Sequence, residues 1–312
     1  MAKEKLIAAD RVLSPTALAI LLTCLGFATF TFTDAIAKLA SAGFPPMVII
    51  FLQSLLGCLC VGSYGLLRHG RTAFKTTHPY LHAFRAGLGG CSSLLNVNAL
   101  KTLQMDEFYA VIFIAPLVVM LLVAAVLKET LGLQRIIAVI IGFLCVLYMI
   151  QPGQSLFQIG ALFAFISTLC YAVSCVVVRK IGQKDSALLF TFYTFCGGLA
   201  VSGTVLLING VEVAPYLHHR DIWLIGVNGV LVIFGAFFVT KGLQIAPMAA
   251  SVTSFHYTQM VWGVFLGYLI FGELPTTTVM IGATGLIATG LYLLVHEKQA
   301  IPKPVAVVIL PD

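Results

Sequence analysis

Residues 115–153, APLVVMLLVAAVLKETLGLQRIIAVIIGFLCVLYMIQPG, contain two apolar runs separated by a short polar break. The first run ends at Leu127, the charged residues of the break lie between Lys128 and Arg135, and the second run continues to Ile150. An apolar run of about 20 residues is long enough for a helix to cross the hydrocarbon core of a bilayer. This stretch therefore predicts two membrane-spanning helices joined by a short polar turn.

The composition extends this prediction to the whole chain. Of the 312 residues, 60% are hydrophobic and 10% are charged, against roughly 25% charged residues in an ordinary soluble domain. The mean hydropathy is +1.02. These values exclude a soluble globular enzyme. The net charge of +6 does not indicate a nucleic-acid partner, because in a membrane protein the placement of Lys and Arg reports orientation.

Apolar runs bounded by charged residues or by Gly, Pro and Asn predict ten transmembrane helices and an all-α polytopic membrane protein. We place these helices at 15–40, 46–67, 80–101, 107–127, 131–150, 157–178, 187–208, 222–241, 248–271 and 275–295.

The distribution of basic residues predicts that both termini are cytoplasmic. With that orientation, fourteen of the 18 Lys and Arg residues lie on the cytoplasmic side, whereas Lys101 and Arg220 lie outside and Lys38 and Arg85 lie within spans. Such an asymmetry is the positive-inside pattern of multi-pass proteins. We expect an integral multi-pass membrane protein, with the lipid bilayer as its surroundings.

Two sets of five helices indicate a duplication around the break at Pro152 and Gly153. Segments 122–148 and 266–292 align at an offset of 144, which pairs Glu129 with Glu273. An odd number of spans in each copy inserts the second copy upside down, which predicts a 5+5 inverted repeat. The expected organisation is a cytoplasmic N-terminal segment, two repeats and a cytoplasmic tail, at 1–14, 15–152, 157–297 and 298–312.

The quoted stretch and its counterpart at 257–294, YTQMVWGVFLGYLIFGELPTTTVMIGATGLIATGLYLL, resemble the two halves of an EamA-type carrier of the drug/metabolite transporter superfamily. The resemblance rests on an apolar helix ending in Gly-Glu, kept as Gly272-Glu273 and altered to Lys128-Glu129. It implies a central cavity lined mainly by the first, third, fourth, sixth, eighth and ninth helices, and alternating access. The segments TDAIAKLA (33–40) and FRAGLGG (84–90) are most similar to bacterial riboflavin or S-adenosylmethionine carriers. This likeness implies a location in the bacterial inner membrane.

Polar groups inside spans are the candidate substrate-binding residues, because an unpaired polar group in hydrocarbon costs several kcal/mol. The predicted ninth helix carries the densest polar run, which predicts that His256, Tyr257, Gln259 and Trp262 contribute to the site. Asp34 lies one helical turn from Lys38. An internal salt bridge between these two residues and a direct role of Asp34 in binding both remain open.

Three further polar residues complete the candidate set. Asn96 belongs to a stripe on the third helix that begins at Arg85, and Tyr171 and Asn228 lie within the sixth and eighth helices. For Arg85 itself, near the end of its span, the expected arrangement is a side chain that reaches the inner headgroups.

The cysteines and histidines show no metal-ligand spacing, and no nucleotide-binding loop is present, so we expect no cofactor and no metal site. The sequence favours a secondary transporter that moves a small organic metabolite, with riboflavin, S-adenosylmethionine or an amino acid as possible substrates. An integral membrane enzyme acting on a lipid and a channel are the alternatives. The oligomeric state is not readable from the sequence.

Overall fold

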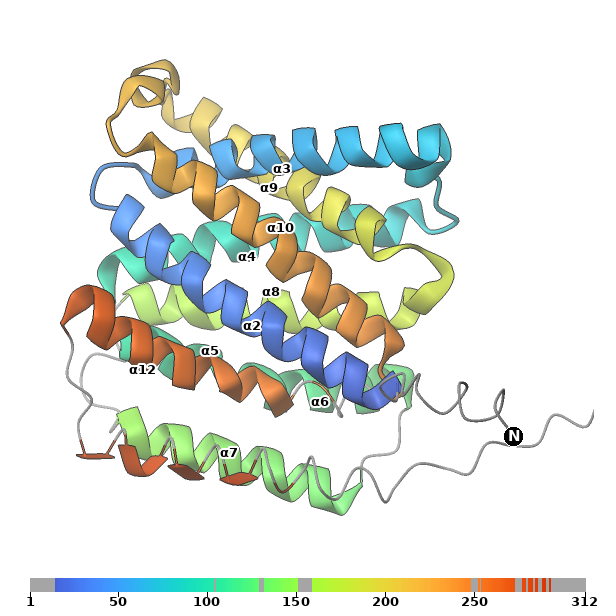
Figure 1. Cartoon of the computed structure of the whole chain (residues 1–312), viewed down its shortest axis with the longest axis vertical. Coiled ribbons are helices and arrows are strands. Elements are labelled where there is room, and N and C mark those ends of the chain that lie inside the picture. Colours follow the sequence, from blue (N-terminus) through green and yellow to red (C-terminus); the bar gives the residue numbers. More distant parts are fainter. Residues whose placement is uncertain are drawn as a thin grey trace, which may run out of the picture.

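The computed structural model is helical throughout its described part (Figure 1). It describes residues 15–103, 105–128, 132–150, 159–247, 252 and 254–272, together with 277–278, 280–282, 284–285, 288–289 and 292. Both termini of the chain, Glu129 and Glu273 lie outside this part.

The helix boundaries follow proline and the polar connections. Pro15, Pro46 and Pro79 each begin a helix, where the missing N–H of proline costs no hydrogen bond. The α-helices are α2 (Pro15–Ala40), α3 (Pro46–His69), α4 (Pro79–Thr102), α5 (Met105–Ile112), α6 (Ala115–Leu127), α7 (Leu133–Ile150), α8 (Ile159–Ile181), α9 (Ala187–Asn209), α10 (Ile222–Ile245) and α12 (Thr258–Phe271). Short 3₁₀ turns are η1 (Gly70–Phe74), η3 (Gly182–Lys184), η4 (Ala214–His218) and η5 (Ser254–Tyr257).

Within the described residues, five helices are long and apolar enough to cross a membrane: α2, α3, α8, α9 and α10. Their outward faces carry large apolar side chains, and Leu59, Leu67 and Leu207 are 59%, 88% and 85% exposed. An apolar surface of this kind is matched by lipid rather than by water. The chain is therefore a polytopic membrane protein.

The predicted fourth helix, 107–127, is divided into two. α5 ends at Ile112, a turn follows at Phe113 and Ile114, and α6 continues to Leu127. Pro116 explains the break, because it cannot donate to the carbonyl of Ile112 and its ring collides with that carbonyl in a regular helix. The turn places Phe113 in the interior of the protein, where its side chain is 0% exposed.

The predicted ninth helix, 248–271, is also interrupted. Its described part changes from the 3₁₀ turn η5 to α12 between Tyr257 and Thr258. At their far ends, α6 and α12 both stop at a residue in the left-handed conformation, Lys128 with φ 56° and Gly272 with φ 70°. Glycine adopts this conformation readily at a helix end, whereas lysine does so at a cost.

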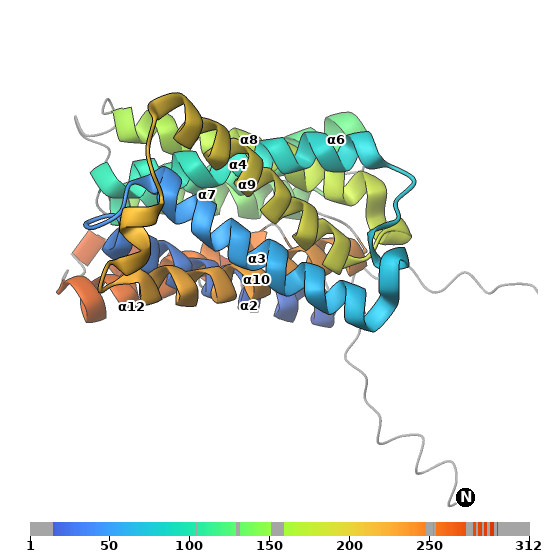
Figure 2. The same ribbon diagram turned by 90° about the horizontal axis from the view of Figure 1, so that it is seen from above.

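The helices form a bundle in which neighbours come from distant parts of the sequence. α2 packs along α10, and α4 packs along both α8 and α9 (Figures 1 and 2). Glycine makes the closest of these approaches possible: a Cβ atom at Gly197 of α9 would collide with the backbone of Ala86 in α4. These pairings leave a cavity at the centre of the bundle.

Candidate functional site

The central cavity has a volume of about 210 Å³ and is lined by helices from both halves of the chain. Its wall includes side chains of α2, α4, α8 and α10, with smaller contributions from α3, α5, α6, α9, η5 and α12. The polar and aromatic lining residues are Phe27, Phe30, Thr33, Asp34, Gln53, Arg85, Ser92, Ser93, Asn96, Ser167, Thr168, Tyr171, Ser174, Thr194, Asn228, Thr240, His256 and Gln259. Polar groups at these positions give the cavity directional hydrogen-bonding capacity.

Six of the eight predicted substrate-binding residues line this cavity: Asp34, Asn96, Tyr171, Asn228, His256 and Gln259. The other two do not. Tyr257 is buried against α7, where its hydroxyl donates to the carbonyl of Val139 at 3.3 Å. The Trp262 side chain is 38% exposed and packs against Phe32 on α2, with the ring centroids 6.3 Å apart.

Asp34 and Lys38 each have a partner other than the opposite charge. The hydroxyl of Tyr109 donates to Asp34 Oδ2 at 3.1 Å. Lys38 Nζ donates to the carbonyl of Leu103 at 3.3 Å and lies 5.2 Å from the ring centroid of Phe271. The salt bridge left open by the sequence is therefore absent, because Tyr109 and the end of α4 hold the two groups separately. Asp34 is half-buried at the cavity and has no basic partner among the described residues.

Aromatic rings surround His256 at one wall of the cavity. The imidazole stacks on Phe27 with the ring centroids 4.2 Å apart and an angle of 2° between the planes. Tyr171 and Phe113 approach the same imidazole edge-on, with centroids at 5.5 and 6.0 Å. Flat aromatic surfaces of this kind favour a planar or cationic solute group.

Two amide side chains bring unused acceptors to the cavity wall. Asn228 Nδ2 donates to Gln53 Oε1 at 2.9 Å, while Asn228 Oδ1 accepts no hydrogen bond from the described residues. Gln259 lies beside the His256 ring, but its Oε1 accepts no hydrogen bond of normal geometry there. Buried acceptors without partners are rare in folded proteins, and they are typical of places where a ligand or water completes the network.

A hydrogen-bonded chain of short polar residues joins α4 to α8. Ser167 Oγ donates to Asn96 Oδ1 and lies 3.0 Å from Ser92 Oγ. This hydrogen bond gives Asn96 Oδ1 a partner within the protein, so Asn96 contributes to packing between the two helices as well as to the cavity surface.

Arg85 is a cavity-lining residue that the sequence placed wrongly. Its side chain is 4% exposed and lines the cavity instead of reaching the headgroups. Arg85 Nη2 donates to the carbonyl of Phe190 and to Thr194 Oγ1, the latter at 2.9 Å. The stripe of Arg85, Ser92 and Asn96 along one face of α4 was the available signal, since all three line the cavity.

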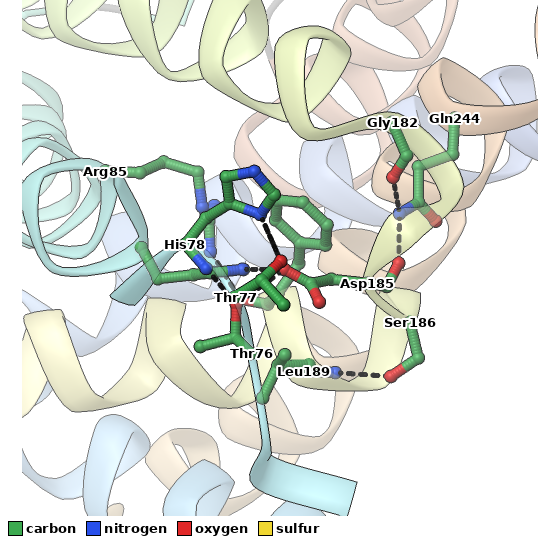
Figure 3. A network of polar contacts seen from close by, with 11 residues as sticks. Thr76, Thr77, His78, Arg85, Gly182, Asp185, Ser186, Leu189 and Gln244 are labelled. Atoms are coloured by element: carbon green, nitrogen blue, oxygen red, sulfur yellow. Dashed lines mark hydrogen bonds and ion pairs between the residues drawn. The ribbon is translucent and has the colours of Figure 1, made fainter. Parts of the chain in front are cut away.

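A polar network centred on Asp185 lies next to Arg85 (Figure 3). Asp185 Oδ2 accepts from Thr76 Oγ1 at 2.7 Å and lies 2.9 Å from His82 Nε2. Gln244 Nε2, near the end of α10, donates to the carbonyls of Gly182 and Asp185 at 2.7 and 2.8 Å. The network thus ties the start of α4 to the connection between α8 and α9 and to α10.

A bundle of apolar helices around a polar cavity is the architecture of a membrane transport protein. The chain belongs to the EamA-like transporter family, whose sequence pattern matches residues 17–151 and again residues 158–296. The family is part of the drug/metabolite transporter superfamily, and its members and the relatives described next are transporters rather than enzymes.

Two relatives illustrate the range of this similarity. An S-adenosylmethionine uptake transporter of Rickettsia prowazekii is 22% identical over 276 residues, which cover 88% of this chain and 92% of that protein. A riboflavin transporter of Brucella anthropi is 22% identical over 263 residues, covering 82% and 90%. A solved crystal structure superposes with a TM-score of 0.71 at 15% identity and covers 92% of this chain and 99% of the other, which shows the shared fold.

Proposed function

We propose that the protein is a secondary carrier that moves a small organic metabolite by alternating access through the central cavity. The observation that carries this proposal is the wall of the cavity, which both halves of the chain build and which holds buried polar atoms without hydrogen-bond partners among the described residues. A site between two halves becomes accessible from either side when the halves rock against each other.

The helix contacts support a 5+5 inverted repeat, because a contact between two helices recurs between their counterparts in the other half of the chain. If the first five predicted helices correspond to the second five, the contact of α2 with α10 corresponds to that of α8 with α4. The contacts of α6 with α8 and of α12 with α2 correspond in the same way. The helix breaks at Phe113 and Tyr257 and the left-handed residues Lys128 and Gly272 are also separated by the offset of 144 found in the sequence.

The proposed topology, with both termini cytoplasmic, predicts which surface positions an impermeant thiol reagent reaches. Arg71, Lys184 and Arg220 are all exposed. In intact cells, a cysteine introduced at Arg71 or Lys184 should add no labelling to that of the parent chain. A cysteine introduced at Arg220 should raise the labelling above that of the parent chain. Permeabilised cells provide the control, since all three positions should then react. Labelling at Arg71 with none at Arg220 in intact cells would invert the topology.

The cavity supports a planar or amphiphilic organic solute as the substrate. The Phe27, Tyr171 and His256 rings supply flat surfaces, and the amides of Asn228 and Gln259 supply acceptors. S-adenosylmethionine and riboflavin, the solutes in the names of the two relatives, both combine a planar ring system with hydrogen-bonding groups, and an amino acid is the smaller alternative. These solutes define the first compounds to test.

Counterflow in proteoliposomes tests the carrier mechanism. Vesicles preloaded with unlabelled S-adenosylmethionine or riboflavin should transiently accumulate the labelled compound above its external concentration, with saturable initial rates. A carrier produces this exchange because one site alternates between the two sides, whereas a channel lets the label equilibrate without overshoot. Recovery of a chemically altered solute would instead favour the membrane enzyme, and saturable binding without any exchange would contradict the carrier.

A further inference from the structure

Arg85 is a buried guanidinium with hydrogen-bonding capacity to spare. Its contacts with Phe190 and Thr194 use Nη2, while Nε donates to no acceptor among the described residues. The ring of Phe190 lies 5.2 Å from the guanidinium carbon. These contacts fix the orientation of the side chain at the cavity wall, and no described residue accepts a hydrogen bond from the other two nitrogens.

No carboxylate among the described residues lies within ion-pair distance of Arg85. Asp185 belongs to the neighbouring network, where it accepts a hydrogen bond from Thr76 (Figure 3). Its Oδ2 also lies 2.9 Å from His82 Nε2. Asp34 is held by Tyr109. A buried charge without a counter-charge is costly, so a protein that keeps one commonly uses it to bind an opposite charge.

We propose that Arg85 binds a carboxylate group of the transported solute, so that the substrate class is an organic acid or a zwitterion of the amino-acid type. This inference rests on the proposed carrier function and narrows it. Because Phe190 and Thr194 engage Nη2, Nε and Nη1 are the donors left for the carboxylate, and charge-assisted hydrogen bonds from a guanidinium to a carboxylate are the strong ones.

The charge of the cavity favours a carboxylate over a phosphate dianion. Arg85 is the one Lys or Arg side chain, and Asp34 the one carboxylate, among the described lining residues. A single guanidinium neutralises a single negative charge, and a phosphate dianion would leave one charge unmatched in a site of low dielectric. A neutral solute such as riboflavin would leave Arg85 unpaired.

Matched ligands test this proposal on purified protein in detergent. The panel contains S-adenosylmethionine, its decarboxylated analogue, free amino acids with their amides, riboflavin and inorganic phosphate. For at least one pair, the carboxylate form should bind the wild-type protein about 10-fold or more tightly than its partner, the range for hydrogen bonds to a charged group. In Arg85→Gln this ratio should fall toward one, with the affinity for the carboxylate-free partner little changed.

Two further variants separate ligand binding from structure. Lys101→Gln removes an exposed cation from the other end of the same helix and should keep the ratio. Arg85→Lys keeps the positive charge but not the guanidinium, so it should retain part of the preference for the carboxylate form. If Arg85→Gln does not fold, Arg85→Lys takes its place in the comparison.

The outcomes distinguish this inference from the carrier proposal. Preference for the carboxylate that persists in Arg85→Gln, or tight binding of riboflavin with no carboxylate preference in any pair, overturns the role of Arg85 and leaves the carrier intact. Tight binding of inorganic phosphate and of no carboxylate would overturn the proposal, because the ligand of Arg85 would then be a phosphate group. Carboxylate preference without counterflow would support the role of Arg85 and contradict the carrier.

Discussion

Replacing Gly197 by alanine should cost about 3 kcal/mol of folding free energy, the upper end of the range for overpacking. The added methyl would collide with the backbone of Ala86, and a backbone carbonyl cannot rotate away as a flexible side chain can. α4 and α9 would have to separate, which also strains the contact of Arg85 with Phe190. We expect the Tm of the purified protein to fall by roughly 5–10 °C.

Gly226→Ala is the matched control, because a methyl at this position of α10 meets nothing within 4 Å. Alanine is the better helix former, so the Tm should stay the same or rise slightly. Equal Tm values for Gly197→Ala and the wild-type protein would show that α4 and α9 are not in backbone contact.

Gln259→Leu should weaken solute binding by about 1–3 kcal/mol, or roughly 5- to 150-fold in Kd. Gln259 lines the cavity, and its unpartnered acceptor is available to a donor on the solute. Leucine has a similar size, and it removes a buried acceptor that accepts no hydrogen bond from the described residues. The Tm without solute should therefore not fall, which separates a binding defect from a folding defect.

Trp262→Leu introduces the same residue into the same helix on its outer side. Trp262 is not part of the cavity wall, so the Kd should match that of the wild-type protein. Isothermal titration with the solute that gives counterflow measures both variants. If Trp262→Leu weakens binding as much as Gln259→Leu does, Trp262 contributes to the binding site. If Gln259→Leu binds the solute normally, Gln259 and α12 do not contribute to it.

Among the described residues, the sequence predicted most helix positions closely, because the length of an apolar run is a local property of the chain. α2 begins and ends where expected, at Pro15 and Ala40. The break at Phe113 was missed even though Pro116 was visible. A proline can be tolerated inside a membrane helix, so the residue alone does not show whether the helix ends.

The candidate site depended on contacts between helices, and one sequence does not contain them. His256 and Trp262 belong to the same polar and aromatic run, but of the two only His256 packs against Phe27 and Tyr171 at the cavity wall. Arg85 lies close enough to its helix end to reach headgroups. The carbonyl of Phe190 on α9 holds it inside instead, and the position of α9 beside α4 was not available from the sequence.

The interleaving of the helices has a consequence for biosynthesis. α2 packs along α10, which is synthesised about two hundred residues later. Likewise, α4 packs along α8 and α9, which are synthesised after it. Until those helices arrive, Arg85 has no acceptor from α9, and the growing chain presents a charged side chain to the translocon or the lipid. The first half of the chain therefore cannot complete its packing before the second half is synthesised. We expect the insertion machinery to keep Arg85 out of the lipid until then.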